Sequence, residues 1–215
     1  MTLITLKDPH SPAAEAYRTL RSNILFAGVE KPIHTLLISS PMAGEGKSLT
    51  AANLAVVLAQ SGQRVLLVDA DLRRPSQHTL WNLPNERGLS SAMLDATQLA
   101  APPIQATPVE NLSVLTAGPT PPNPADLMIS KQMNALLETL ARLADTVLFD
   151  APPILVATDA PLLASKLDGL LLVIKAGTTR RDHAERAKEI LERAHVRVIG
   201  AVLNNAPKDS AAGGY

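Results

Sequence analysis

Apolar residues are grouped along this chain into six short runs, and the stretches between the runs space their apolar residues at helical intervals. Runs that are apolar at consecutive positions are typical of strands buried on both faces of a parallel sheet. The predicted strands span residues 34–39, 64–69, 111–117, 145–150, 168–176 and 196–205.

Four longer stretches are predicted helices. The first has Ser11 as its N-cap and Pro12 at the first helical position, and Gly28 ends it. Gly62 gives the second helix a C-terminal signal. The predicted helices span residues 11–28, 47–62, 123–143 and 178–195. Strand–helix alternation of this kind predicts an α/β fold, a doubly wound and mostly parallel sheet with helices on both faces.

The whole chain, residues 1–215, is expected to form one domain. The Pro-rich segments 101–108 and 118–124 are typical of surface connections rather than of a linker between domains. The last residues, from about 207 to 215, are rich in Ala and Gly, so we expect a flexible tail.

Composition narrows the class of protein. Hydrophobic residues make up 46% of the chain but aromatic residues only 2%, so the core must be built from Leu, Val, Ile and Ala. The 20 basic and 20 acidic side chains balance, which gives no electrostatic case for a nucleic-acid partner. Cysteine is absent, which excludes disulfides, thiolate metal sites and iron–sulfur clusters. No apolar run reaches the roughly 18 residues that span a bilayer, so we expect a soluble, cytoplasmic protein.

A glycine-rich turn follows the first predicted strand and leads into a helix, which is the layout of a P-loop. Bare backbone N–H groups can wrap a polyphosphate, and the helix adds its partial positive N-terminus. The motif is imperfect, because Pro41 stands where the usual pattern has Gly. The alternative is a tight loop with an exposed lysine. The residues expected to bind nucleotide phosphates are Ala43, Gly44, Glu45, Gly46, Lys47, Ser48 and Leu49.

Three carboxylates stand at the ends of two other predicted strands. Asp69 and Asp71 are two positions apart and share a face, and Asp150 ends another strand. Ligands of open α/β sheets lie beyond the carboxyl ends of the strands, so these acids and the turn should converge on one crevice. Acids beside a triphosphate need a cation between them, and Mg²⁺ suits this donor set. For each aspartate alone, a helix cap or a surface charge is the alternative.

ATP is the favoured nucleotide. Guanine-specific P-loop proteins usually read their base with an Asn-Lys-x-Asp string, which this chain lacks. Asn204 and Asn205 end the last predicted strand, where an amide could hydrogen-bond the adenine edge. A simple turn explains the two asparagines equally well.

Three stretches resemble the Walker A, A-prime and B motifs of the bacterial tyrosine kinases of capsule and exopolysaccharide synthesis, which belong to the deviant-Walker branch of P-loop ATPases. They read SSPMAGEGKS, VLLVDADLRRP and VLFDAPPIL. Further similarity, in SPAAEAYRTLRSNI and IGAVLNN among others, extends the resemblance over almost the whole chain. It implies an ATP- and Mg²⁺-dependent protein-tyrosine autokinase that acts in trans within a ring.

The resemblance also implies roles for individual residues. Lys47 would stabilise the γ-phosphate, and Ser48, Asp69 and Asp150 would hold Mg²⁺. Asp69 or Asp71 would help to deprotonate the tyrosine hydroxyl. Two arginines follow these acids, Arg73 and Arg74. One of them would face phosphate or a neighbouring subunit; the alternative is a solvated pair.

The helix at residues 11–28 carries a charged stripe that matches the family's oligomerisation segment. On physical grounds alone a solvated face would explain it, whereas the resemblance implies a ring of subunits. The residues are Glu15, Arg18 and Arg21.

The C-terminus departs from the family, whose tail carries a tyrosine cluster. Here Tyr215 is the expected phosphoryl acceptor, and Tyr17 is the chain's other tyrosine. The alternatives are a truncated tail, a different substrate, and a protein that uses ATP only as a switch.

The expected partners follow from the family. They are a transmembrane polysaccharide co-polymerase that activates the kinase and holds it at the inner membrane, and a tyrosine phosphatase. A partitioning-type ATPase is a rival interpretation, but that group has a lysine where this chain has Met42. A non-catalytic adaptor of the co-polymerase is another.

We predict that Arg18→Ala and Arg21→Ala together leave the fold intact but yield monomers, because the charged stripe is expected to pack against the next protomer. Size-exclusion chromatography measures the outcome. An unchanged elution volume would count against the oligomerisation stripe.

Overall fold

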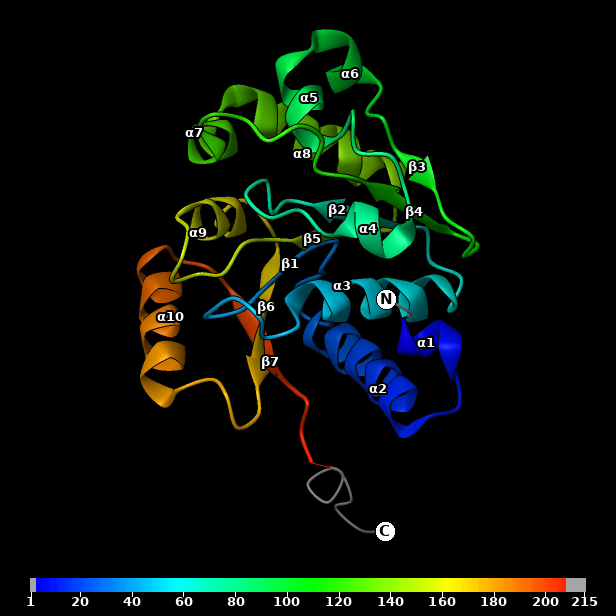
Figure 1. Cartoon of the computed structure of the whole chain (residues 1–215), viewed down its shortest axis with the longest axis vertical. Coiled ribbons are helices and arrows are strands. Elements are labelled where there is room, and N and C mark those ends of the chain that lie inside the picture. The colour runs from blue at the N-terminus through cyan, green and yellow to red at the C-terminus, as the bar shows by residue number, and fades with distance from the viewer. Residues whose placement is uncertain (1–2, 208–215) are drawn as a thin grey trace.

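The computed structural model describes residues 3–207, which form one twisted sheet covered by helices (Figure 1). Within these residues the sheet has seven strands in the order β3-β4-β2-β5-β1-β6-β7. Every neighbouring pair is parallel except β3 and β4. The strands are β1 (Thr35–Ser39), β2 (Val65–Asp69), β3 (Gln105–Ala106), β4 (Leu112–Leu115), β5 (Thr146–Asp150), β6 (Gly169–Lys175) and β7 (Val198–Asn204). The predicted mostly parallel α/β sheet is confirmed.

All six predicted strands are present, but the segment 101–108 is more than a surface connection. Its residues Gln105 and Ala106 form β3 and pair antiparallel with β4. A two-residue strand has no hydrophobic period to detect, so the pattern alone gave no sign of it.

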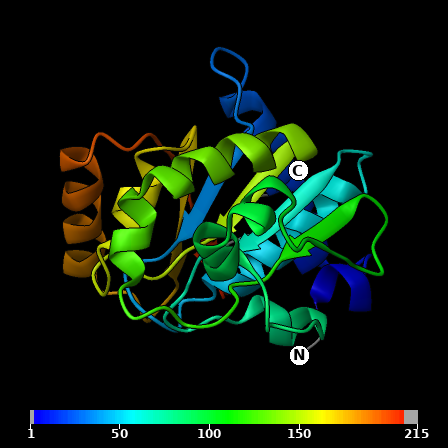
Figure 2. The same ribbon diagram turned by 90° about the horizontal axis from the view of Figure 1, so that it is seen from above.

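Helices cover both faces of the sheet, as Figures 1 and 2 show. They are α1 (Ile4–Lys7), α2 (Pro12–Ala27), α3 (Lys47–Ala59), α4 (Gln77–Trp81), α5 (Leu89–Leu94), α6 (Ala96–Ala100), α7 (Pro124–Ile129), α8 (Lys131–Leu143), α9 (Asp159–Ala164) and α10 (Arg181–Arg193). One apolar cluster joins the sheet to residues of α5, α7, α8, α9 and α10, and a second joins the other face to α2, α3 and α4. No helix among residues 3–207 is both long and apolar enough to cross a membrane.

The predicted helix boundaries hold at the N-terminus and fail in the middle of the chain. Helix α2 has Pro12 at its first turn and Ser11 as its cap, whose side chain accepts from the Ala14 backbone N–H at 3.2 Å. The single helix predicted for 123–143 is wrong, because the chain forms α7 and α8 with a break at Ser130. Its backbone is extended and its hydroxyl accepts from Met133 N at 3.1 Å, which caps α8.

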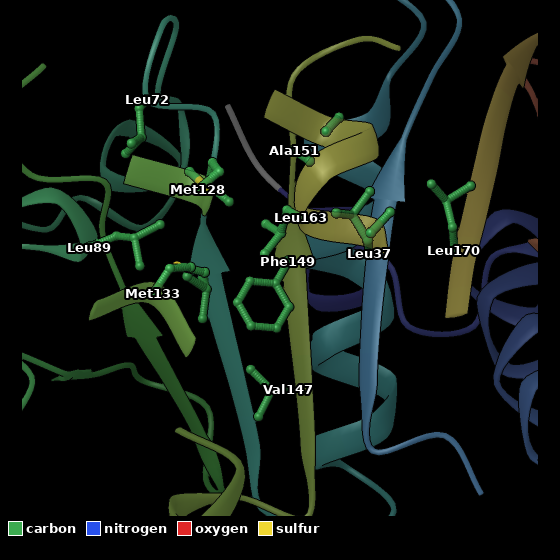
Figure 3. Close-up of a cluster of buried hydrophobic side chains, with 14 of the residues drawn as sticks. Leu37, Leu72, Leu89, Met128, Met133, Val147, Phe149, Ala151, Leu163 and Leu170 are labelled. Atoms are coloured by element: carbon green, nitrogen blue, oxygen red, sulfur yellow. The ribbon is translucent and has the colours of Figure 1, made fainter. Parts of the chain in front are cut away.

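The predicted aliphatic core is confirmed. The apolar cluster that includes α5 and α7 to α10 contains one aromatic side chain. Phe149 of β5 is fully buried and lies between Leu37 of β1 and Met133 of α8 (Figure 3). On the other face, all ten residues from Thr50 to Ala59 of α3 are buried. Several of them are alanines, which let this helix approach the sheet closely. Its start is therefore held firmly against the carboxyl ends of the strands.

Strand register sets two acids side by side at that edge. The Cα of Asp69 on β2 pairs with that of Asp150 on β5, and Asp150 also pairs with Ile38 of β1. The end of β1, from which the glycine-rich turn departs, therefore adjoins the strand that carries Asp150.

Asp168 ties the start of β1 to the turn before β6. Its Oδ2 accepts from the backbone N–H groups of His34 and Thr35 at 3.0 and 2.9 Å and from the Thr35 hydroxyl at 2.8 Å. Burial alone would raise the pKa of this carboxyl, but the hydrogen bonds from Thr35 and His34 hold the pKa below its ordinary value. The ionised form is therefore the one that stabilises the fold.

We expect Asp168→Ala to lower the free energy of unfolding by about 1–3 kcal/mol at neutral pH, because three donors lose their acceptor. A depressed folded-state pKa contributes stability above the unfolded-state value and loses it as the pH falls through the folded-state value. The gap between wild type and variant should therefore close below about pH 4. Urea unfolding over a pH series measures it, with the exposed Glu110→Ala as control. A gap that stays constant with pH would contradict this assignment.

Candidate nucleotide site

The turn between β1 and α3 requires glycine at two positions. Gly44 and Gly46 have φ angles of 81° and 92°, a left-handed conformation that residues with a Cβ rarely adopt. A Cβ on Gly46 would also overlap Nδ2 of Asn204. These glycines leave bare backbone at the start of α3, where a helix N-terminus favours anionic groups. The geometry suits a phosphate-binding turn.

Lys47 begins α3 and lies among the acids rather than in solvent. Its Nζ is 2.9 Å from Oδ2 of Asp71 and 3.3 Å from Oδ1 of Asp150, and it donates to the Ser48 hydroxyl at 3.2 Å. Burial alone would lower the pKa of this amine, but the charges of Asp150 and Asp71 leave the pKa above its ordinary value. The side chain is therefore an ammonium, the form that binds phosphate.

The three aspartates are all buried, with residue exposures of 0% for Asp69 and Asp150 and 3% for Asp71. Oδ2 of Asp69 accepts from the backbone N–H groups of Ser76 and Gln77, both at 2.8 Å. Burial and the neighbouring Asp150 raise the pKa of Asp69 to about 8 in spite of these bonds. Two buried carboxyl groups on paired strand positions are stabilised in their ionised form by a cation beside them.

Gln77, which the sequence pattern did not reveal as a site residue, is fully buried beside these acids. Its Nε2 donates to Oδ2 of Asp150 at 2.8 Å and to the Ser48 carbonyl at 3.1 Å. It follows the A-prime motif in a short polar run with no helical period, so no local signal distinguishes it.

The side chains of Glu45 and Asn204 form hydrogen bonds with other parts of the protein. The buried Glu45 carboxylate accepts from the Met42 N–H at 3.0 Å and from the Thr179 hydroxyl at 2.5 Å. Nδ2 of Asn204 donates to the Glu45 carbonyl at 2.9 Å, so it contacts the turn itself. Adenine recognition by Asn204 or Asn205 stays a prediction. Thr179, which follows β6, was not anticipated, because only the fold brings it to the turn.

The two arginines after the A-prime motif differ in their contacts. The Arg73 guanidinium binds the buried Asp159 at 2.8 and 3.1 Å, an ion pair that fixes the loop after β2 to the start of α9. Arg74 is exposed, and its backbone N–H donates to Oδ1 of Asp71 at 3.0 Å. The predicted contact of one of them with phosphate or a neighbour stays a prediction.

The charged stripe on α2 makes contacts within the chain. Arg18 pairs with Glu15 at 2.8 Å and donates to the Pro9 carbonyl at 2.7 Å. Arg21 donates to the Val57 carbonyl of α3 at 3.2 Å. Glu15 is exposed and the two arginines are half-buried. Tyr215, the predicted acceptor, lies outside the described residues.

The residues at the turn fit Mg²⁺ in their chemistry. Ser48, Asp69 and Asp150 offer hydroxyl and carboxylate oxygens, the hard donors that this ion prefers. Within residues 3–207 no group of three or more acidic, His or Cys side chains could hold a metal ion by itself. Mg²⁺ is commonly bound by one or two carboxylates together with phosphate oxygens and water, so these residues would hold it jointly with a nucleotide.

Comparison with known proteins gives a consistent set of relatives. A family model described as "ParA: NUBPL iron-transfer P-loop NTPase" matches residues 31–209. The chain is 46% identical over 202 residues to tyrosine-protein kinase YwqD of Bacillus subtilis, across 94% of this chain and 85% of that protein. It is 41% identical over 207 residues to the putative tyrosine-protein kinase CapB of Staphylococcus aureus, across 96% of this chain and 90% of that one. The crystal structure of the chimerical protein CapA2B2 superposes with a TM-score of 0.90 at 40% identity, covering 96% of this chain and 90% of that one.

Gly46→Ala should weaken the binding of Mg²⁺ and ATP by about tenfold or more, since a strained backbone costs about 1–3 kcal/mol and the new Cβ displaces Asn204. Isothermal titration calorimetry measures the affinity. Gly62→Ala is the matched control, because Gly62 has a φ of 90° but nothing within 4 Å of an added Cβ. Equal affinities for the two variants would show that the turn does not bind the phosphates.

Proposed function

The chain belongs to the bacterial tyrosine kinases, a family of P-loop NTPases of the ParA type, and from this membership we propose that it transfers the γ-phosphoryl group of ATP to tyrosine, its own chain included. The contact of Lys47 with Asp71 and Asp150 at the start of α3 is the observation that carries the proposal. The contact brings the Lys47 ammonium together with an acid that follows β2 and one that ends β5, which supports a role for Lys47 in binding phosphate.

In the proposed reaction the turn and Lys47 bind and orient the phosphates. Ser48, Asp69 and Asp150 would hold Mg²⁺, which would supply positive charge to neutralise the phosphates. The tyrosine oxygen forms a bond to the γ-phosphorus, the bond from that phosphorus to the oxygen of ADP breaks, and the phenolic proton passes to a carboxylate. Asp69 and Asp71 are both candidates for this base, because both are buried carboxylates at or just after the end of β2.

The cellular role that we propose is control of capsule or exopolysaccharide synthesis and export. The relatives support it, since the chain is similar to CapB and to the CapA2B2 chimera over nearly its whole length. We propose a ring built through the α2 stripe, with a membrane-spanning polysaccharide co-polymerase as activator. That partner would hold the kinase at the inner membrane, and a tyrosine phosphatase would reverse the modification.

A second candidate function is an ATP-dependent switch or adaptor for the same co-polymerase. The small number of tyrosines in this sequence favours the switch or adaptor. The chain has two, and burial raises the pKa of Tyr17, whose side chain is in contact with Thr50 and Asn53. Tyr17 is thus a poor acceptor in the folded protein, and Tyr215 is the acceptor that we propose within these 215 residues.

Incubation with labelled ATP and Mg²⁺ should label tyrosine in the wild type. Lys47→Met should lower the rate by about 100-fold or more, because a preorganised charge opposite the transferring phosphoryl group is lost. Tyr215→Phe should abolish self-labelling but leave ATP hydrolysis intact. Phosphotyrosine detection and phosphate release are the two measurements.

Tyr17→Phe is the control and should be labelled like the wild type. Mixing Lys47→Met with Tyr215→Phe should restore label on the Lys47→Met chain, as expected of transfer between subunits. Phosphate release without any protein labelling would contradict the autokinase and favour the switch.

A further inference from the structure

Gln77, the first residue of α4, joins three separate parts of the nucleotide site. Its side-chain amide reaches Asp150 at the end of β5 and the Ser48 carbonyl at the start of α3, at 2.8 and 3.1 Å. Its backbone N–H donates to Oδ2 of Asp69 at the end of β2, at 2.8 Å. One buried residue therefore contacts all three residues that are expected to bind Mg²⁺.

We propose that Gln77 is a positioning residue that holds Ser48, Asp69 and Asp150 in the arrangement that receives Mg²⁺ with ATP. This inference deepens the proposed function, because a role of Gln77 in phosphoryl transfer rests on the proposed kinase reaction. The contacts themselves, and the binding of Mg²⁺ and ATP, do not depend on which group accepts the phosphoryl.

The orientation of the Gln77 amide is fixed by Trp81, four residues later on the same helix. The indole Nε1 donates to Oε1 of Gln77 at 3.2 Å, and both residues are buried. An indole N–H can only donate, so it selects the oxygen end of the amide. The NH₂ end then faces two acceptors, Asp150 and the Ser48 carbonyl. Every polar atom of the side chain has a partner, and a flipped amide would lose all three bonds.

Asp150 needs such a partner because its other oxygen faces Lys47. Oδ1 lies 3.3 Å from the Lys47 ammonium, while Oδ2 accepts from Gln77. In the proposed reaction Lys47 serves the γ-phosphate, which weakens its hold on Asp150. Gln77 supplies a neutral donor that keeps the fully buried carboxylate oriented without adding charge that would compete with Mg²⁺.

Gln77→Met keeps the length of the side chain and removes its three hydrogen bonds. We expect the Mg²⁺ concentration that half-saturates ATP binding to rise by about tenfold or more, because bonds to a buried charge are among the stronger ones. ATP affinity without Mg²⁺ should change by less than about twofold, since the backbone N–H groups of the glycine-rich turn and the Lys47 ammonium are retained. In the kinase assay, kcat at limiting Mg²⁺ should fall and recover at high Mg²⁺.

Gln105→Met is the matched control, because the Gln105 amide also gives two hydrogen bonds, to Pro84 O and the Thr116 hydroxyl, at the sheet edge. Its Mg²⁺ midpoint should equal that of the wild type, whatever its melting temperature. Trp81→Phe is a second variant, which frees the amide to flip and should shift the midpoint by about fivefold. In the Gln77→Met background the same Trp81→Phe change should add nothing.

Trp81 is the chain's one tryptophan, so intrinsic emission reports directly on this contact. Gln77→Met should blue-shift the emission of the nucleotide-free protein, because the indole loses its acceptor. A Mg²⁺ midpoint in Gln77→Met that equals the Gln105→Met value would overturn the positioning role, as would full additivity of the two substitutions. If Mg²⁺ and ATP bind as expected but no tyrosine is labelled, the kinase assignment fails while the role of Gln77 stands.

Discussion

The structure depends on an unequal set of buried charges, in which the single ammonium of Lys47 lies near three buried acidic side chains. Lys47 contacts Asp71 and Asp150 directly, and the burial of Asp69 beside Asp150 raises the pKa of Asp69. Such a cluster is unfavourable by itself, because buried charge is stabilised only by partners. Backbone N–H groups of the loop after β2 and the amide of Gln77 provide part of that stabilisation. The remainder is what a phosphate-bound divalent cation would supply.

The architecture places this cluster by simple means. A parallel sheet brings the carboxyl ends of its strands to one edge, so Asp69 and Asp150 become neighbours through register alone. The alanine-rich α3, buried along most of its length, sets Lys47 and Ser48 against that edge. Two apolar layers, one on each face, keep the strands from shifting. The chemistry of the site is thus a consequence of strand order and of one closely packed helix.

Features that are local or periodic could be predicted from the sequence. The six longer strands, the capped helix α2, the glycine turn and the acids at strand ends all have signatures within a few residues. Features that depend on contacts between distant segments could not. Gln77 meets Asp150 across 73 positions, and Thr179 meets Glu45 across 134, so no window contains either pair. Short helices such as α4 and α9 are held by packing rather than by propensity, and the two-residue β3 exists because β4 offers it an edge.

The bond between Arg21 and the Val57 carbonyl affects how α2 variants are interpreted. Arg21 is hydrogen-bonded to α3, the helix that begins with Lys47. Glu15, by contrast, is exposed, and its one described side-chain partner is Arg18. A slow Arg21 variant would therefore have two explanations, loss of a contact with a subunit of the proposed ring or a shift of α3, which begins with Lys47. A Glu15 variant distinguishes the two explanations, since it leaves the bond between Arg21 and Val57 in place, and a kinetic defect would then point to the proposed ring.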